Sequence, residues 1–386
     1  MPKCLSRQSG LKVSKSVRFL DLSVSDADER RQIIAAVEEM LDHGRVVMGP
    51  EVAEFERQVA DYCGRRHAVG VGSGTDALIL GLKALGIGAG DEVITTPLSW
   101  LATGSAILLN GATAVCGDID DSLNLDPTTI EPLITSRTKA ILPVHFTGFL
   151  ARMPEIVEIA RRHSLLVIED GSQAFGATAG GRPCGSFGDM ACISLNAMKV
   201  LGGLGDAGVV LTDDADVARR LDRLRHSGVE DRDYCLELSH NCRLDTLQAA
   251  VLIKRLARLP TMISRRRALA HRYDQELAEY VGTTVQPSGY EGVFYTYPIR
   301  TKRRDALRDH LELLGIETRI QHPILMNDQP AFQGRIRGSS PKAAALIKQV
   351  LCIPVHEKLG DDDQDFVISA VIDFFGETID GHPCFL

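Results

Sequence analysis

The 386-residue sequence predicts an α/β protein, in which a large domain with a mostly parallel central sheet flanked by helices precedes a smaller α+β C-terminal domain. Two observations favour this fold class. Short apolar or β-branched runs alternate with helical patterns as far as Asp213, which is typical of parallel strands joined by crossover helices. The run from Ala140 to Val144 is almost continuously apolar, as expected for a strand covered on both faces.

The predicted elements follow in order along the chain. Apolar residues at helical spacing predict a first helix from Ser25 to His43, and Gly44 is its expected stop. The alternating part predicts strands at 68–71, 92–95, 113–115, 138–144, 165–169, 190–194 and 207–211. The helices predicted between them lie at 76–85, 101–109, 127–133 and 153–163.

Beyond Asp213 the pattern changes, because long helical segments replace the alternation. The elements predicted there are helices at 217–227, 244–256, 260–280 and 305–314, and a strand at 292–301. We therefore predict an N-terminal arm at 1–19, a large domain at 20–258 and a small C-terminal domain at 259–386.

The composition is that of an ordinary globular protein, with 44% hydrophobic and 24% charged residues. The 43 basic and 51 acidic residues give a formal net charge of −8 at pH 7. A negative average field repels both nucleic acids and anionic membranes, so we expect neither as a partner.

The nine cysteines are an odd number, are scattered, and include no Cys-x-x-Cys spacing. This argues against a disulfide framework or a zinc site and favours reduced thiols. There is no apolar run of about eighteen residues, the length that crosses a membrane, and no apolar segment of a secretory signal after Met1. The sequence therefore predicts a cytoplasmic, soluble protein of the size of an enzyme.

The first loop with chemical potential runs from Gly70 to Leu78 and joins a predicted strand to a predicted helix. Its glycines let the backbone approach a ligand, and the helix N-terminus near Thr75 favours a phosphate. A dinucleotide fingerprint is an alternative, but the spacing is G-x-G-x-G, and no acidic residue ends the second strand. A purely structural tight turn is a further alternative.

Two more loops follow strands of the same predicted sheet, where α/β proteins bind ligands. One strand ends in Glu169 and Asp170, which point to opposite faces, so that one of them can face a pocket. Another runs into a glycine-flanked stretch that carries Lys199 among apolar and small neighbours, which favour the neutral amine of a Schiff base. Together, a phosphate cradle, a carboxylate and a lysine meet the needs of pyridoxal 5′-phosphate.

From about Phe19 to about Phe375 the chain resembles the DegT/DnrJ/StrS family of sugar aminotransferases, which are fold-type-I enzymes dependent on pyridoxal phosphate. The ordered motifs that carry the resemblance are Val47-Met-Gly-Pro50, Phe55-Glu56, Gly72-Ser-Gly-Thr-Asp-Ala77, Ile168-Glu-Asp-Gly-Ser-Gln173, Ser194-x4-Lys199, Leu204-Gly-Asp-Ala-Gly208 and Asn241-x-Arg243-Leu-Asp245.

The resemblance implies roles for four residues around the cofactor ring. Lys199 would form the Schiff base and move protons. Asp170 would bind the pyridine nitrogen, and Gln173 the ring hydroxyl. Trp100, the only tryptophan, would stack on the ring, although a core-filling role is the alternative.

The resemblance also implies a phosphate site and a dimer. Gly74, Thr75 and the hydroxyl of Ser194 would hold the phosphate. Asn241 would reach the phosphate of the neighbouring subunit, so that a homodimer shares its active sites. Arg243 would bind substrate anions or, alternatively, form a structural ion pair.

The substrate-side loop departs from the family pattern, which has an aromatic residue before a proline and a histidine four residues beyond it. Here His322 replaces the aromatic residue and Asn327 replaces the histidine. Both are candidate substrate residues. Lys254, Arg255 and Arg265–Arg267 are candidates for holding a diphosphate, with a solvated helix face as the alternative.

The reaction that the resemblance implies is a ping-pong transamination, from an amino acid such as L-glutamate to a keto sugar linked to a nucleoside diphosphate. The segments 204–208 and 241–245 resemble the branch that acts on 3-keto sugars. A 4-keto-sugar or cyclitol aminotransferase, a non-catalytic regulator that binds pyridoxal phosphate, and an NAD-dependent oxidoreductase stay open. A sugar dehydratase of the same family has histidine where Lys199 stands.

Overall fold

The computed structural model describes residues 16–376, and an eight-stranded sheet lies at its centre. The strands of this sheet are β1 (His67–Val71), β2 (Glu92–Thr95), β3 (Thr113–Cys116), β4 (Thr138–Leu142), β5 (Leu166–Asp170), β8 (Met190–Ser194), β9 (Gly208–Thr212) and β15 (Ile336–Arg337). Their order across the sheet is β1-β9-β8-β5-β4-β2-β3-β15. Only the two pairings of β9 are antiparallel, so the predicted mostly parallel sheet is confirmed.

Helices cover both faces of the sheet. Successive side chains of a strand point to opposite sides, so apolar strands give each face a core that helices bury. On β2, Val93 belongs to the core on one face, and Ile94 to the core on the other. The helices that bury residues in the first core are α3 (Gly74–Ala84), α4 (Leu101–Leu109) and α6 (Ala215–Arg225). Those in the second are α2 (Pro50–Cys63), α5 (Met153–Arg162) and α7 (Thr246–Leu277).

The C-terminal part has its own small antiparallel sheet and its own core. Its order is β12-β14-β16, and α8, α10 and the end of α7 contribute to the core. The elements are β12 (Gly282–Thr283), β14 (Tyr297–Arg300), β16 (Val350–Ile353), α8 (Arg304–Leu313), α9 (Pro341–Leu346) and α10 (Asp361–Gly376). Val17 pairs with Ile316 and is buried in this core, so the end of the predicted N-terminal arm is held in place.

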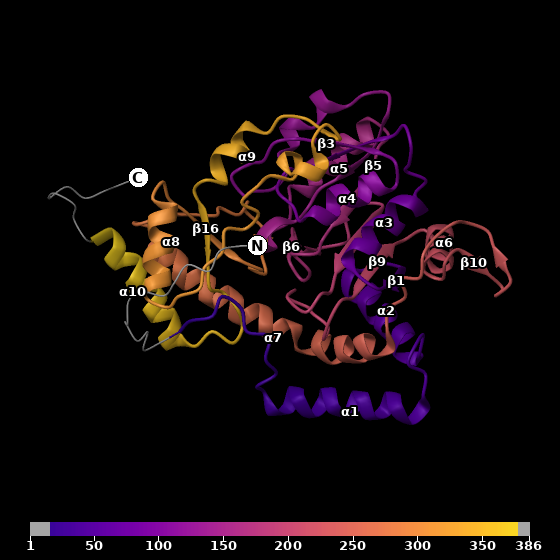
Figure 1. Cartoon of the computed structure of the whole chain (residues 1–386), viewed down its shortest axis with the longest axis horizontal. Coiled ribbons are helices and arrows are strands. Elements are labelled where there is room, and N and C mark those ends of the chain that lie inside the picture. Colours follow the sequence, from indigo (N-terminus) through magenta and orange to yellow (C-terminus); the bar gives the residue numbers. More distant parts are fainter. Residues whose placement is uncertain (1–15, 377–386) are drawn as a thin grey trace.

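Helix α7 runs through the boundary predicted between residues 258 and 259 and joins the two parts of the molecule (Figure 1). The sequence predicted two separate helices in this region, at 244–256 and 260–280. That prediction was wrong. Leu256 and Leu259 before Pro260 and Ile263 after it are buried in the second core of the central sheet, and this packing keeps the helix continuous.

In the sequence, the first two helices precede all strands of the central sheet. Helix α1 (Ala27–His43) matches its prediction and lies beside α7 (Figure 1). Helix α2 was missed, although Pro50 occupies its first turn, where the absent N–H has no partner to lose. The helix predicted at 127–133 is instead two 3-10 turns, because Pro132 cannot donate the bond that would continue it.

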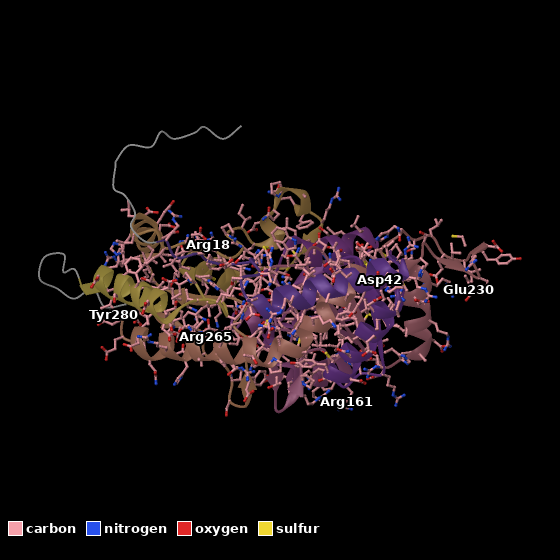
Figure 2. The ribbon with its side chains drawn as sticks, turned by 90° about the horizontal axis from the view of Figure 1, so that it is seen from below. Arg18, Asp42, Arg161, Glu230, Arg265 and Tyr280 are labelled. Atoms are coloured by element: carbon pink, nitrogen blue, oxygen red, sulfur yellow. The ribbon has the colours of Figure 1, made fainter. Side chains whose placement is uncertain are left out.

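Shorter strands form two further sheets. One has the order β13-β6-β7, and the other is a hairpin of two strands. Their bounds are β6 (Thr178–Ala179), β7 (Arg182–Pro183), β10 (Val229–Glu230), β11 (Tyr234–Cys235) and β13 (Tyr290–Glu291). Phe294 has a φ of 50°, which ends the extended chain, so the strand predicted at 292–301 is only β14. Figure 2 places Glu230, on the hairpin, and Tyr280 at opposite ends of the molecule.

Among the helices of residues 16–376, none combines the length and the apolar run needed to cross a membrane. The cysteines at described positions are free thiols, and all but Cys235 are buried. The cysteines at positions 4 and 384 lie outside the described residues.

Candidate active site

A cavity of about 560 Å³ lies where β1, β5 and β8 end. The structure brings eight of the sequence-predicted site residues together in its walls: Gly74, Thr75, Trp100, Asp170, Gln173, Ser194, Lys199 and His322. β1 and β8 both pair antiparallel with β9 and β5 is parallel to β8, so the carboxyl ends of all three strands meet at one edge of the sheet.

The N-terminus of α3 forms one wall of the cavity. Ser73 caps the helix, because its Oγ accepts a hydrogen bond from Asp76 N at 3.1 Å. A Cβ on Gly74 would lie 2.4 Å from the Cβ of Ser194, so only glycine lets the Ser194 side chain lie against the first turn. The first N–H groups of a helix have no carbonyl partner within it. This wall therefore offers N–H groups, a positive dipole end and a hydroxyl to a phosphate.

Asp170 is held at the end of β5 with its carboxylate in the cavity. The side chain is buried, Thr103 Oγ1 donates to Oδ2 at 3.1 Å, and Ser172 N donates to Oδ1 at 3.2 Å. Its backbone is bonded on both sides, to Pro143 O and from His145 N. A buried carboxylate that is fixed in this way can pair with a protonated ring nitrogen.

Glu169 points to the other face of β5 and does not line the cavity. Its carboxylate accepts hydrogen bonds from Gly185 N (3.0 Å), Phe187 N (2.7 Å), Gly188 N (3.0 Å) and the His145 ring (3.1 Å). Burial raises the pKa of Glu169, but the bond and the charge of His145 and the backbone N–H groups outweigh it and hold the pKa below its ordinary value. Glu169 is therefore a buried anion that anchors the loop after β7.

Lys199 lies in the loop between β8 and β9. Its Nζ is 4.7 Å from the centre of the Tyr295 ring, a cation–π contact. Backbone bonds from Lys199 N to Asn196 O and from Gly203 N to Leu195 O, both 2.8 Å, close this loop. The amine is thus directed into the cavity that also holds Asp170.

Gln173 and Trp100 also line the cavity. Gln173 is buried and its Oε1 accepts from Thr147 N at 3.0 Å, which orients the amide. Trp100 is 61% exposed, so the alternative in which it fills the core is wrong. Its ring lines the cavity instead, with its centre 5.9 Å from the ring centre of His322.

His322 is a neutral imidazole between aromatic rings. Its ring centre is 5.6 Å from that of Phe146. Burial, together with the positive charge of Lys199, lowers the pKa of His322 to about 4. Its Nε2 is buried and has no hydrogen-bond partner within residues 16–376. This nitrogen is available to a bound molecule.

Three predicted residues do not line this cavity. Asn241 is exposed, and Arg243 pairs its backbone with Val71. Asn327 lies in the short turn Met326–Asp328, and its Nδ2 donates to Asp328 Oδ1 at 3.2 Å.

The helix α7 arginines are not a solvated face, because most of them form ion pairs and backbone bonds. Arg255 bonds to Glu29 and to Gly202 O, and Arg266 is buried against Glu357. Arg265 bonds to Leu359 O and Asp361, and Arg267 to Gly292 O and Glu291. Arg255 and Arg265 also line a second cavity, of about 820 Å³, together with Lys199, and their role as diphosphate ligands stays a prediction.

Sequence reasoning missed several residues of the cavity, among them Thr103, Ser172, Tyr295 and Arg319. Arg319 is the second cation of the cavity wall beside Lys199, and its guanidinium lies 4.9 Å from the centre of the Phe19 ring. No carboxylate of residues 16–376 forms an ion pair with it. No local pattern could have identified it, since it follows a short loop in an otherwise ordinary polar stretch.

These contacts fit pyridoxal phosphate. The Gly74–Ser194 contact and the start of α3 suit its phosphate, the held Asp170 carboxylate suits its ring nitrogen, and Lys199 suits its aldehyde. Trp100 and Gln173 flank the space between them. The cofactor prediction from the sequence therefore agrees with the geometry.

Comparisons with known proteins agree with this site. The DegT/DnrJ/EryC1/StrS aminotransferase family model matches residues 27–372. The dTDP-3-amino-3,4,6-trideoxy-alpha-D-glucose transaminase of Streptomyces venezuelae is 41% identical over 360 residues, covering 92% of this chain and 95% of that protein. The UDP-N-acetyl-3-dehydro-alpha-D-glucosamine 3-aminotransferase of Acidithiobacillus ferrooxidans is 38% identical over 352 residues, covering 90% and 95%.

A solved structure shares the whole fold. The crystal structure of S. venezuelae DesV in complex with a ketimine intermediate superposes with a TM-score of 0.91 at 40% identity, covering 95% of this chain and 100% of that one. Pyridoxal phosphate, or its amine form, is the cofactor of such enzymes. The chain belongs to the DegT/DnrJ/EryC1/StrS aminotransferase family.

Proposed function

We propose that this aminotransferase moves an amino group from an amino acid, L-glutamate, to a 3-keto sugar linked to a nucleoside diphosphate. The observation that carries the proposal is the single cavity in which Lys199, the buried Asp170 and the Gly74–Ser194 cradle meet. The choice of a nucleotide-linked 3-keto sugar is supported by the two relatives described above, whose names place the amino group at C3 of dTDP- and UDP-linked sugars.

When bound, pyridoxal phosphate supplies the carbonyl that accepts the amino group and a ring that withdraws electrons. The amine of Lys199 would hold the cofactor and, as the base, would move the proton between the donor Cα and the cofactor C4′. The Asp170 carboxylate would pair with the protonated ring nitrogen. The start of α3 and Ser194 hold the phosphate, so the reacting atoms stay aligned with Lys199.

The substrate side of the cavity is built from Arg319 and His322. We assign the Arg319 guanidinium to a substrate anion, because it has no ion-pair partner in the described chain and reaches the cavity. The neutral His322 Nε2 suits a sugar hydroxyl, which both donates and accepts hydrogen bonds. Asn327, which does not line the cavity, has no assigned contact here.

We further propose a homodimer in which Asn241 serves the site of the neighbouring subunit. Asn241 is exposed and absent from the walls of its own cavity. Close to it in sequence, Tyr234, Leu236 and Leu238 are 68%, 54% and 86% exposed, and apolar side chains gathered on a surface mark protein contacts. Arg243 belongs to the same segment.

The reduced state of the described cysteines supports a cytoplasmic location.

The decisive experiment separates the two half-reactions. The holoenzyme with L-glutamate alone should yield 2-oxoglutarate and change the absorbance of the bound cofactor. A panel of nucleotide-linked 3-keto and 4-keto sugars and a keto cyclitol, read by mass change, then identifies the acceptor. Absence of 2-oxo acid with every amino donor would leave a non-catalytic regulator and overturn the proposal.

The matched variants are Lys199→Ala and Lys139→Ala. Lys139 is exposed on β4, outside the cavity, so its loss should leave turnover unchanged. Lys199→Ala should lose the visible absorbance of the bound cofactor and all turnover. Full activity of Lys199→Ala would refute the assigned role of this amine.

A further inference from the structure

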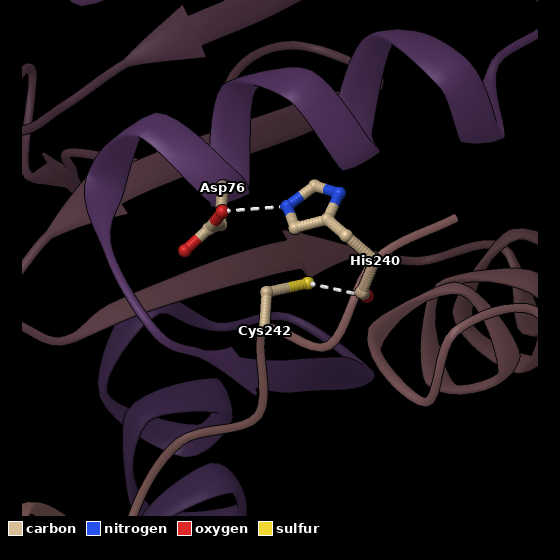
Figure 3. A group of neighbouring side chains, drawn as sticks. All are labelled: Asp76, His240 and Cys242. Carbon is tan, nitrogen blue, oxygen red and sulfur yellow. Dashed lines mark hydrogen bonds and ion pairs between the residues drawn. The ribbon is translucent and has the colours of Figure 1, made fainter.

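Asp76, His240 and Cys242 form a cluster outside the cavity described above (Figure 3). Asp76 lies in the first turn of α3, and the other two lie in the segment between β11 and α7. Asp76 Oδ1 is 2.9 Å from His240 Nε2, and one potential ligand atom from each of the three residues lies within 4.8 Å of the others. The cluster therefore has the dimensions of a small metal site.

The fold holds the Asp76 carboxylate and the backbone of Cys242 in place. Asp76 Oδ2 accepts from Ser73 Oγ at 2.8 Å, which leaves Oδ1 to face His240. The backbone of Cys242 is bonded on both sides, since Gly72 N donates to its carbonyl at 2.8 Å and its N–H donates to Arg225 O at 3.2 Å. Ligands fixed by such supporting bonds bind a metal ion more tightly than mobile ones.

A nucleophilic role for Cys242 does not fit these contacts. Its Sγ is directed at the backbone oxygen of His240, at 3.5 Å, and not at the imidazole ring (Figure 3). A Cys–His–Asp triad needs the opposite arrangement, with the ring nitrogen next to a reactive thiolate.

We propose that Asp76, His240 and Cys242 form a zinc-binding site. Thiolate, imidazole and carboxylate are the ligands that Zn²⁺ takes, and three protein ligands leave a fourth position to water. On binding, the Cys242 S–H bond is replaced by an S–Zn bond and the proton goes to solvent, while the His240 ring nitrogen exchanges its bond to Asp76 for the metal. The two anionic ligands then neutralise the charge of the ion.

The chain has no Cys-x-x-Cys spacing, which is why the sequence alone argues against a zinc site. The ligands come from position 76 and from a His-x-Cys segment 164 residues further on, a pairing that no local spacing reveals. In the single chain His240 is half-exposed. Asn241 lies between two ligands, so bound zinc would hold it in place, but the metal site does not depend on the role proposed for Asn241.

The test is zinc binding by the holoenzyme after dialysis against a chelator. Protein re-equilibrated with Zn²⁺ is dialysed free of excess metal, and bound zinc is measured by atomic emission. Wild-type protein should retain one zinc ion per chain more than His240→Gln or Cys242→Ser. The matched control Cys235→Ser removes an exposed thiol outside the cluster and should bind as the wild type does. Excess Mg²⁺ should not compete, because it prefers oxygen ligands.

A second readout keeps the test independent of how well the variants fold. Zn²⁺ should raise the melting temperature of the wild-type and Cys235→Ser proteins, since a ligand that binds only the folded state stabilises it. It should not raise that of His240→Gln, whose surface change is expected to leave the fold and the cofactor absorbance intact. Equal zinc retention by all variants, or none by the wild type, would overturn the proposal.

Discussion

Gly74 is a residue at which the cavity tolerates almost no added volume. A methyl group there would lie 2.4 Å from the Ser194 Cβ, so Gly74→Ala must push the start of α3 away from the cradle. We expect a loss of about 1–3 kcal/mol of stability, typical of overpacking, together with weaker cofactor binding. Gly88→Ala is the control, because its added Cβ would meet only Asn110 O at 3.5 Å. Urea unfolding and cofactor titration measure both effects.

His322 provides a pH prediction. In the folded protein the pKa of His322 is about 4, so the ring stays neutral above that pH, whereas in the unfolded chain it has the ordinary histidine pKa of 6.5. Because the unfolded state then binds more protons, stability falls as the pH drops from about 6.5 towards 4. Replacing the ring by a neutral amide, His322→Gln, should reduce this loss.

The measurement for His322 is the free energy of unfolding of both proteins between pH 7 and pH 5. The difference between wild type and His322→Gln should grow in favour of the variant as the pH falls. Parallel pH profiles for the two proteins would show that the imidazole is protonated equally in the folded and unfolded states.

At the scale of elements, β5 illustrates how one strand serves two purposes. Asp170 faces the cavity, while Glu169, its neighbour, anchors the loop that follows β7 through three backbone N–H groups. The sequence predicted that the two carboxylates point to opposite faces, which the structure confirms. It could not predict which loop the buried carboxylate would hold, because that loop follows it by 16 to 19 residues without any pattern.

Glu169→Gln should therefore destabilise the protein strongly. The NH₂ group of the new glutamine would face backbone N–H donors that need an acceptor. The buried negative charge beside His145 is also lost, and breaking a buried pair in this way costs about 3–5 kcal/mol of stability. Because the pKa of Glu169 lies below the ordinary glutamate value, its charge stabilises the folded wild type at any pH above that ordinary value. This stability is lost as the pH falls from the ordinary value through the lowered pKa. The variant has no such carboxyl group and should lack this acid dependence. Urea midpoints at pH 7 and pH 4 check both statements, with exposed Glu38→Gln as an unchanged control.

At the scale of the whole molecule, the proposed shared active site predicts complementation. Lys199→Ala and Asn241→Ala homodimers should each be inactive or nearly so. In a mixed dimer, one site has both the intact lysine and an intact Asn241 from the other chain. Unfolding and refolding a mixture should thus restore about a quarter of the wild-type sites. No recovery would mean that Asn241 acts within its own chain or that the subunits do not pair.

The way the two parts of the chain join was outside the reach of sequence patterns. Helix α7 passes the predicted boundary, and β15, from beyond it, pairs with β3 in the central sheet. Proline is a reliable local break only where packing does not oppose it, and here buried Leu259 and Ile263 on either side of Pro260 hold the helix. Domain boundaries therefore depend on contacts between distant segments.

The sequence by itself determined the fold class and the cofactor, and it predicted the residues proposed to hold that cofactor. These follow from local information, namely the alternation of strands and helices, the glycines at a strand–helix turn, and an ordered series of motifs. Only the tertiary structure decided that Trp100 is exposed, that Arg319 and Tyr295 reach the cavity, and that Asp76 meets His240. The physical reason is that such contacts join side chains far apart in the chain, where geometry rather than spacing sets the distance.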